Sequence, residues 1–303
     1  MIDLLAKVKE RLDEIGELKK AKYPSACQGQ VLAFINQKGG VGKTTMAYNF
    51  AQGLARQGKK VLCLDMDPQA NLTLLFDGVI KKDEGYNLYH LLVNSVRELK
   101  SLHTPVVFKD ILLEKNNLAL LPGAQDLAGL DLALAQVNTT PKQLVLKRFI
   151  EKNDLTSHYD AIIIDAPPTL GLLVINILCA CHGVMVPFRP DEFSKAGLKH
   201  FYQVLDEIKE MGLTEAPKIL AHIPNLVDPR RKQEGLDLKR IEEDLIILSG
   251  DKKSRVVAPF YNRSQLVRAL AQKKSVYDYE AVEFIELQEK FNQLTNMMSE
   301  LNP

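Results

Sequence analysis

Glycine, lysine and threonine residues between positions 36 and 45 have the types and the spacing that bind phosphate. The segment reads NQKGGVGKTT, and it lies between an apolar run, Val31–Ile35, and a helical pattern. Glycines let the backbone approach an anion closely, and the N–H groups at the start of the following helix point at the same anion. We therefore expect this loop to bind the phosphates of a nucleotide, through Gly39, Gly40, Val41, Gly42, Lys43, Thr44 and Thr45.

The match to the general phosphate-loop pattern G-x-x-x-x-G-K-[ST] is incomplete. Gln37 stands where the first glycine of that pattern falls, so Gly39 and Gly40 must supply the flexible backbone. Lys43 is expected to reach the β- and γ-phosphates, and the Thr44 hydroxyl is expected to bind Mg²⁺. The alternative is a glycine-rich turn that binds no ligand, and the strand and helix patterns on either side argue against it.

A second lysine, Lys38, lies inside the loop, where an ordinary phosphate loop has no need of one. It is either a solvated loop lysine or a residue that crosses a dimer interface. In the second case it would stabilise the charge of the transferred phosphoryl group on the partner's nucleotide, as an arginine finger does.

Two further apolar runs end in aspartate. Val61–Leu64 precedes Asp65 and Asp67, and Tyr159–Ile164 precedes Asp165. Carboxylates at strand ends opposite a phosphate loop suit the binding of Mg²⁺ and the positioning of water. We expect Asp165 to hold Mg²⁺ through water. Read alone, the sequence around Asp67 is equally typical of a turn.

Together these three segments resemble the deviant Walker motifs of the ParA family of partition ATPases, which are relatives of MinD and of the nitrogenase iron protein. The resemblance extends over most of the chain, although Asp191 stands where the family usually has glutamate. It implies that Lys38 is the family's signature lysine, that Lys38, Lys43 and Asp67 are catalytic, and that Asp67 orients or activates the attacking water. It also implies a Mg²⁺ site at Thr44, Asp67 and Asp165.

The same resemblance implies a function. ATP and Mg²⁺ would bind between two protomers, the dimer would bind DNA without sequence preference, and a ParB-type centromere-binding protein would stimulate slow hydrolysis. Pro224 and Asn225, at the end of an expected strand, would contact the adenine. Two alternatives stay open: a related ATPase that positions a protein cargo, and a DNA-binding regulator that uses ATP as a switch.

The composition limits where nucleic acid could bind. The chain has 303 residues, 46% of them hydrophobic, and a formal net charge of +1. DNA binding must therefore come from a local basic patch rather than from overall charge. Basic residues gather in the C-terminal half, where ParA proteins hold DNA, although ordinary solvated side chains are the alternative. The candidate contacts are Arg230, Arg231, Arg263 and Arg268.

Strand and helix patterns alternate along the chain, which predicts an α/β fold: a mostly parallel twisted sheet with helices on both faces, of the deviant Walker P-loop type. Expected strands cover 31–35, 60–65, 117–121, 160–165, 183–187 and 218–223. Expected helices follow the phosphate loop and cover 88–99, 127–134, 144–150, 172–180, 195–211 and 232–248.

The two ends of the chain are expected to be helical. Residues 1–25 would form an amphipathic helix and a linker, with the helix packed on its own domain or on a second copy, and residues 26–303 would form the ATPase domain. The last helix, 279–301, is acidic, so it should pack on the core through Val282, Ile285, Phe291 and Leu294 rather than bind an anionic membrane.

No secretory signal is evident and no apolar run approaches ~18 residues, so we expect a cytoplasmic, nucleoid-associated protein without a membrane partner. The cysteines show no metal-binding spacing, and reduced thiols are the simpler interpretation. They are Cys27, Cys63, Cys179 and Cys181.

Overall fold

The computed structural model describes residues 29–76, 85–96, 108–135, 141–169, 171–250, 255–262 and 264–301. A seven-stranded sheet with the order β3-β4-β2-β5-β1-β6-β7 runs through it. All neighbouring strands of this sheet pair in parallel except β3, which is antiparallel to β4. The strands are β1 (Gln30–Phe34), β2 (Val61–Asp65), β3 (Leu113–Lys115), β4 (Leu118–Leu121), β5 (Ala161–Asp165), β6 (Gly183–Phe188) and β7 (Lys218–Pro224).

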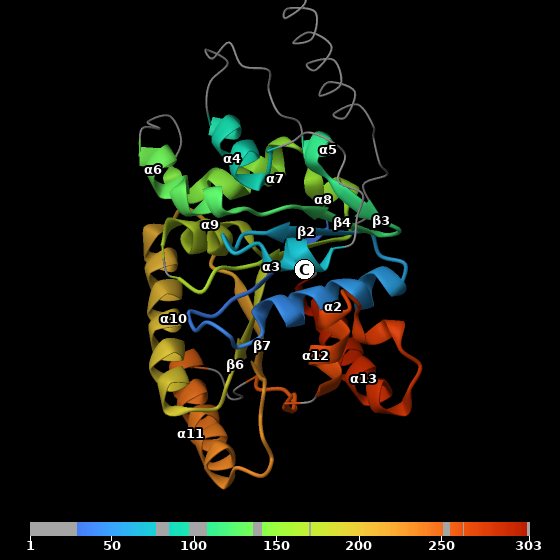
Figure 1. The fold of residues 1–303 in the computed structure, drawn as a ribbon. Helices are drawn as coiled ribbons and strands as arrows, with labels where there is room; N and C mark the ends of the chain where they lie inside the picture. The colour runs from blue at the N-terminus through green and yellow to red at the C-terminus, as the bar shows by residue number, and fades with distance from the viewer. Residues whose placement is uncertain are drawn as a thin grey trace, which may run out of the picture.

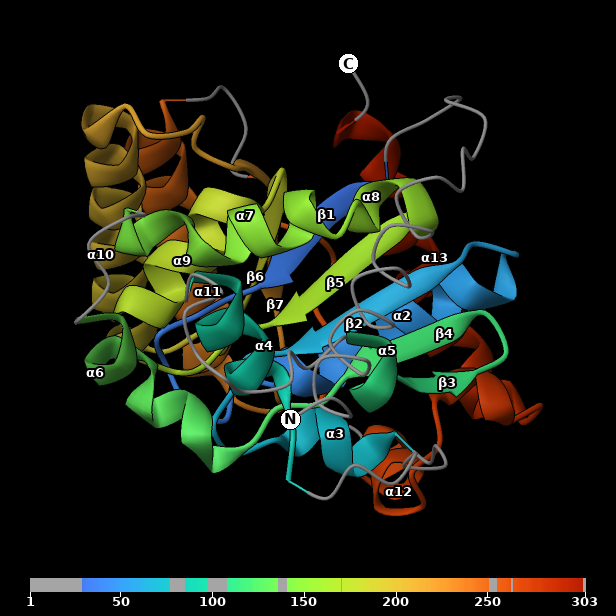
Figure 2. The same cartoon turned by 90° about the horizontal axis from the view of Figure 1, so that it is seen from above.

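The central strands are apolar and buried because helices cover both faces of the sheet. One layer contains α2 (Lys43–Arg56), α12 (Ser264–Ala271) and α13 (Val282–Asn296), and it lies below the sheet in Figure 1. The opposite layer is seen from above in Figure 2. Its main helices are α4 (Leu88–Val96), α7 (Val145–Lys152), α9 (Leu172–Ala180) and α10 (Glu192–Met211).

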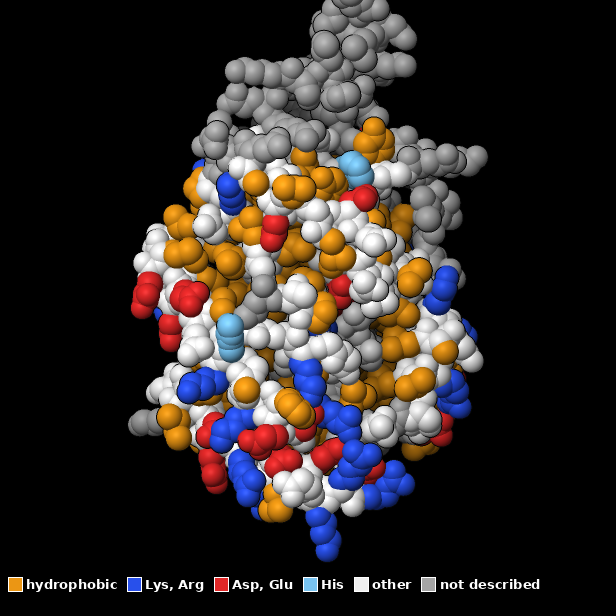
Figure 3. All heavy atoms as spheres, turned by 60° about the vertical axis from the view of Figure 1, so that its left-hand side comes forward, with side chains coloured by type: hydrophobic (Ala, Val, Ile, Leu, Met, Phe, Trp, Pro, Cys, Tyr) orange, Lys and Arg blue, Asp and Glu red, His pale blue; other side chains and the backbone are white. Residues whose placement is uncertain are grey.

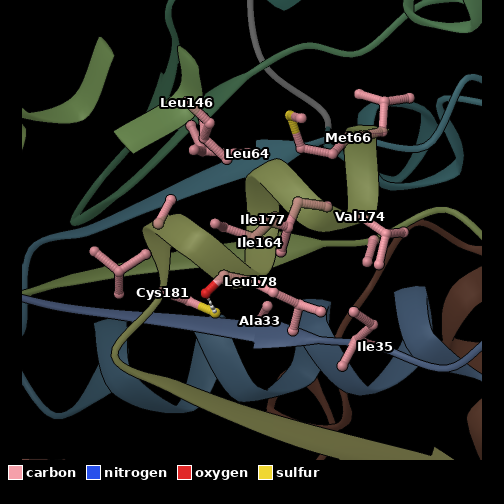
Figure 4. Close-up of a cluster of buried hydrophobic side chains, with 14 of the residues drawn as sticks. Ala33, Ile35, Leu64, Met66, Leu146, Ile164, Val174, Ile177, Leu178 and Cys181 are labelled. Atoms are coloured by element: carbon pink, nitrogen blue, oxygen red, sulfur yellow. Dashed lines mark hydrogen bonds between the residues drawn. The ribbon is translucent and has the colours of Figure 1, made fainter. Parts of the chain in front are cut away.

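Alternate residues of each strand enter different cores, as the period of a strand requires. In β1, Leu32 and Phe34 pack with α2 and α13, whereas Val31 and Ala33 pack with the opposite layer. Figure 4 shows this second core, where the strand residues meet the side chains of α9. Nearly every residue of α9 is apolar because the helix is buried on several sides.

One polar residue in α9 links it to its neighbour. The side-chain oxygen of Asn176 accepts a hydrogen bond from the backbone N–H of Leu146 in α7 (3.1 Å). Its amide donates to the carbonyl oxygens of Lys142 (2.7 Å) and Leu172 (2.9 Å). Because all these groups are paired, Asn176 has a structural role.

The remaining elements are short, apart from α11 (Lys232–Ser249), which packs against α10. The short helices are α3 (Asn71–Leu75), α5 (Phe108–Ile111), α6 (Leu130–Ala135) and α8 (Leu155–His158). Four 3₁₀ helices occur among the described residues: η1 (Gln125–Gly129), η2 (Lys142–Leu144), η3 (Val276–Asp278) and η4 (Met297–Leu301).

The expected α/β fold is confirmed, and all six expected strands are present within one or two residues. The sequence did not predict α3 or the antiparallel strand β3. It was also wrong about two residues of the last helix, since Val282 is 83% exposed and Ile285 is 42% exposed. The apolar face of α13 is instead made of Phe284, Leu287, Phe291 and Leu294, which are buried.

The predicted N-terminal helix, Cys27 and Arg263 lie outside the described residues. Within the described part of the chain, no helix is both long and apolar enough to cross a membrane. The three described cysteines, Cys63, Cys179 and Cys181, are buried free thiols. Burial raises the pKa of all three, which keeps them protonated and unreactive.

Candidate nucleotide and magnesium site

The phosphate loop leaves the carboxyl end of β1, which lies between β5 and β6 in the sheet. The register pairs Asp65 of β2 with Asp165 of β5, and Asp165 with Phe34 of β1, so three strand ends meet beneath the loop. This is the edge where open α/β sheets bind ligands. The predicted lysines and aspartates are therefore gathered at one place.

Backbone geometry explains two of the glycines in the loop. Gly40 and Gly42 have φ angles of +72° and +91°, which residues with a side chain rarely adopt. A Cβ atom on Gly42 would lie 2.3 Å from Nδ2 of Asn225. That amide donates to the carbonyl oxygen of Val41 (2.8 Å), so Asn225 supports the loop from within the protein.

The helix that follows the loop begins without a cap. No side chain caps α2 at Gly42, and the first turn contains no acidic residue. The first helical hydrogen bond runs from the N–H of Met46 to the carbonyl oxygen of Gly42 (2.9 Å). The N–H groups before it and the positive end of the helix dipole are available to an anion.

A pocket of about 670 Å³ opens above these N–H groups. Its polar wall comes from the loop and from Asp67, and its apolar wall comes from residues that the sequence analysis did not single out. The lining residues are Gly39, Gly40, Gly42, Lys43, Thr44, Thr45, Asp67, Gln69, Asn71, Leu74, Leu75, Pro168, Leu226 and Leu270.

Asp165 lies fully buried at the bottom of this site. Neither of its carboxylate oxygens accepts a hydrogen bond of regular geometry from the described residues. Burial and, to a smaller extent, the nearby charge of Asp65 raise its pKa well above the usual value, and the neighbouring Thr44 hydroxyl opposes this only in part. A buried carboxylate without a partner is costly, so its position indicates a ligand that compensates the charge.

Asp65 has a different role, because its carboxylate is already paired. Oδ2 accepts hydrogen bonds from the backbone N–H (2.8 Å) and the hydroxyl (2.6 Å) of Thr73, and Oδ1 accepts from the N–H of Asp67 (3.3 Å). Burial nevertheless raises the pKa of Asp65 to about 6. Asp65 thus holds α3 against the end of β2 and fixes the segment that carries Asp67.

Asp67 and Lys43 both face the pocket. Oδ1 of Asp67 accepts a hydrogen bond from the N–H of Gln69 (2.9 Å), which fixes the carboxylate. The ammonium of Lys43 is buried and donates to the carbonyl oxygen of Lys38 at 3.4 Å. Burial lowers the pKa of Lys43, while the charges of Asp165 and Asp67 act in the opposite direction.

The charges at this site fit Mg²⁺. Three buried carboxylates, Asp65, Asp67 and Asp165, lie at this edge of the sheet, whereas Lys43 supplies a single buried ammonium, which the charges of Asp165 and Asp67 attract. Among the described residues, no three histidine, cysteine or acidic side chains are arranged to ligate a metal ion by themselves. A divalent ion would therefore take most of its ligands from phosphate and water, as Mg²⁺ does at nucleotide sites.

Lys38 points away from the pocket and is not among its lining residues. Its ammonium forms an ion pair with Oδ2 of Asp191, and it lies 5.8 Å from the centre of the Phe193 ring. The loop thus brings Lys43 to its own pocket but leaves Lys38 beside the start of α10.

The predicted adenine contacts, Pro224 and Asn225, do not line the pocket. Leu226, which follows them and has a φ angle of +57°, lines it together with Leu270 of α12. The end of the expected strand β7 was the only sequence signal for this side of the pocket. The residues of the apolar wall could not be predicted from it, because Leu270 reaches the pocket only through the packing of α12.

The basic residues predicted to bind DNA lie on separate elements. Arg230 and Arg231 precede α11, whereas Arg268 is in α12, on another side of the molecule in Figures 1 and 2. Arg230 forms two hydrogen bonds with Asp228 (2.9 and 3.0 Å), and Arg231 lies 3.4 Å from Glu234. Lysine and arginine side chains mix with acidic ones over α10 and α11 in the lower part of Figure 3.

Arg268 also has an acidic partner. Its guanidinium donates to Glu283 of α13 at 2.9 Å, and it lies over the rings of Tyr279 and Phe284. The three candidate DNA contacts that the structure describes, Arg230, Arg231 and Arg268, therefore all pair with carboxylates of the same protomer.

Comparisons with known proteins agree with this geometry. A family model described as an AAA domain matches residues 29–218. The chromosome-partitioning ATPase Soj of Treponema pallidum is 32% identical over 231 residues, which cover 76% of this chain and 83% of that protein. Many solved structures share the fold. That of a Cyanothece McdA variant in complex with ATP matches with a TM-score of 0.75 at 20% identity, over 90% of this chain and 98% of that one.

A second solved structure is more similar in sequence. Cobyrinic acid a,c-diamide synthase from Mycobacterium smegmatis, with a bound ATP analogue and magnesium, is 30% identical. It matches with a TM-score of 0.59 over 70% of this chain and 78% of that chain.

Proposed function

The chain belongs to the ParA family of partition ATPases, and on that premise we propose that it hydrolyses ATP with Mg²⁺ to drive the segregation of DNA. The observation that best supports binding of ATP with Mg²⁺ is the fully buried carboxylate of Asp165 beside the phosphate loop, which accepts no hydrogen bond of regular geometry from the described residues. A nucleotide with its divalent ion would compensate both this carboxylate and the uncapped start of α2.

Several polar residues at this site have a part in the proposal. The N–H groups of the loop and the ammonium of Lys43 bind the phosphates. The Thr44 hydroxyl would ligate Mg²⁺, and Asp165 and Asp67 would hold it through water. Bound Mg²⁺ supplies charge neutralisation at the phosphates. Asp67, fixed by the N–H of Gln69, also orients the attacking water and accepts a hydrogen bond from it.

A dimer would complete the site. Lys38 is on the phosphate loop but lies outside its own pocket, where its ammonium pairs with Asp191. We infer that two copies face each other across their nucleotides and that each Lys38 contacts the nucleotide of the other copy. Phe193 beside it is 81% exposed and offers apolar area for such a contact.

The later steps of the proposed cycle, DNA binding and stimulated hydrolysis, are inferred from membership of the ParA family. The ATP-bound dimer would bind DNA non-specifically through phosphate contacts, and thereby associate with the nucleoid. A ParB-type protein would then stimulate hydrolysis and release the dimer. Arg230 and Arg231 are exposed enough to exchange their carboxylate partners for DNA phosphates, although their pairing with Asp228 and Glu234 weakens the net positive charge of this loop.

Sedimentation with a non-hydrolysable ATP analogue tests the proposal directly. The wild-type chain should change from monomer to dimer when the analogue and Mg²⁺ are added, and Asp67→Ala should do the same with ATP itself because hydrolysis is blocked. Phosphate release should be slow for the wild type and undetectable for Asp67→Ala. A wild-type protein that stays monomeric with the analogue would overturn the dimer, and normal hydrolysis by Asp67→Ala would overturn the role of that residue.

A further inference from the structure

We propose that Asp191 is a positioning residue that holds Lys38 within its own protomer, so that dimer formation must first break this ion pair. The inference rests on the proposed dimer, because it concerns what Lys38 does before a second copy arrives. It adds a contact that opposes premature assembly.

The backbone near Lys38 is fixed, so that only its side chain needs to move. The N–H of Lys38 donates to Oδ1 of Asn36 (2.9 Å), and the amide of Asn36 donates to the carbonyl oxygen of Pro187 (2.7 Å). The Lys38 side chain extends from this anchored loop to Asp191 and Phe193, which belong to the start of α10. Lys38 can therefore change partners without any change in the loop that binds the phosphates.

Asp191 suits this role because its two oxygens have separate tasks. Oδ1 caps α10, accepting hydrogen bonds from the N–H (2.9 Å) and the hydroxyl (3.0 Å) of Ser194, while Oδ2 accepts from Lys38. Aspartate is a favoured N-cap and glutamate is not, since the longer side chain does not return to the helix N–H groups as readily. The shorter acid at this position thus fixes the carboxylate at the place where Lys38 meets it.

The ion pair between Lys38 and Asp191 is weak enough to be broken when a dimer forms. The side chains of Lys38 and Asp191 are 33% and 29% exposed, so water screens their attraction. Burial raises the pKa of Asp191, but the hydrogen bonds from Lys38 and Ser194 outweigh this effect, and the pKa is lowered overall. A nucleotide phosphate in a closed, drier interface attracts the ammonium more strongly. The pair therefore biases Lys38 without preventing its transfer.

The substitution Asp191→Asn separates the two tasks of this residue. Asparagine caps helices as well as aspartate does, so α10 keeps its cap while the charge that attracts Lys38 is removed. Dimer formation with the non-hydrolysable analogue should then require about two- to tenfold less protein, because neither protomer of the variant has an ion pair to break. The effect is modest because a partly exposed ion pair contributes little free energy. Asp206→Asn is the matched control: Asp206 pairs with Lys209 on the same helix, and its loss should leave dimerisation unchanged.

A double-mutant cycle in the nucleotide-free monomer tests the pair without a dimer. Thermal unfolding of Lys38→Met, Asp191→Asn and the double variant should be non-additive, because either substitution alone already breaks the contact. An Asp191→Asn protein that dimerises no better than the wild type, or worse, would overturn the inference while the proposed function stands. Additive unfolding would overturn it as well. If the wild type itself fails to dimerise, the proposed function fails and the inference fails with it.

Discussion

Charged residues are arranged differently in the phosphate-loop region and in the basic loop before α11, which contains Arg230 and Arg231. At the first, Asp165 is buried and accepts no regular hydrogen bond from the described residues, and no side chain among them caps the start of α2. At the second, the side chain of Arg230 is 87% exposed and its guanidinium is nevertheless paired with Asp228. An exposed ion pair contributes little to the free energy of folding and says little about ligands. A buried charge without a counter-charge costs much more free energy, so it indicates that a ligand compensates it. The contrast therefore indicates a charged ligand at the phosphate loop and gives no such indication at the basic loop.

The largest effect is expected from Lys43→Ala. Without the buried ammonium that faces the phosphates, ATP affinity should fall by about 100-fold or more, since hydrogen bonds to charged groups are among the strongest. Titration with a fluorescent ATP analogue measures this. Lys209→Ala, which removes an exposed and paired lysine on α10, should bind ATP as the wild type does. If Lys43→Ala and Lys209→Ala bound the ATP analogue with equal affinity, the buried lysine of the phosphate loop would have no special role in binding.

Asp165→Asn should move stability and activity in opposite directions. The substitution removes a fully buried carboxylate whose burial cost outweighs its attraction to Lys43 and Thr44, so the nucleotide-free protein should unfold at a higher temperature, by about 1 kcal/mol or more in free energy. Magnesium-dependent ATP hydrolysis should fall below detection. A nucleotide-free variant less stable than the wild type would show that the charge of Asp165 is compensated by the protein itself.

A pH dependence should follow from Asp65. Because its pKa is raised to about 6 in the folded state, the folded protein binds this proton more tightly than the unfolded chain does. The resulting stabilisation is present below about pH 4 and is lost as the pH rises through 6. Asp65→Asn, which cannot ionise, should therefore gain stability relative to the wild type between pH 4 and 7, by about 1–3 kcal/mol. Denaturant unfolding at several pH values measures the difference, and a constant difference would contradict the assignment.

The smallest effect is expected at the basic loop. If DNA binds there, Asp228→Asn should strengthen the salt-sensitive retention of the ATP-bound dimer on DNA a few-fold, since Arg230 and Arg231 lose an acidic partner. Arg230→Glu with Arg231→Glu should weaken retention more strongly, and Asp206→Asn should not change it. Unaltered retention in the first two variants would remove this loop from the DNA-binding surface.

The sequence was sufficient for the features whose signal is local. The loop at 36–45 and the aspartates at 65, 67 and 165 each follow an apolar run that predicts a strand, and parallel strands bring their ends together. The contacts of Lys38 and Asn225 could not be predicted, because they join residues 153 and 184 positions apart. The pairing of Asp65 with Thr73 was missed for another reason: nothing in residues 71–75 marked α3 as a helix.

The C-terminal part of the chain also supports the helix that receives the phosphates. Asn49, fully buried in α2, accepts a hydrogen bond from the N–H of Val276 (2.8 Å), and Tyr277 lies so close to Gly53 that a Cβ there would be 2.5 Å from its hydroxyl. Phe291 of α13 belongs to the same core as Phe50. During synthesis α2 therefore lacks one wall of its core until residues 276–291 have left the ribosome. A nascent chain should accordingly gain a stable phosphate-binding helix only after α13 has been synthesised.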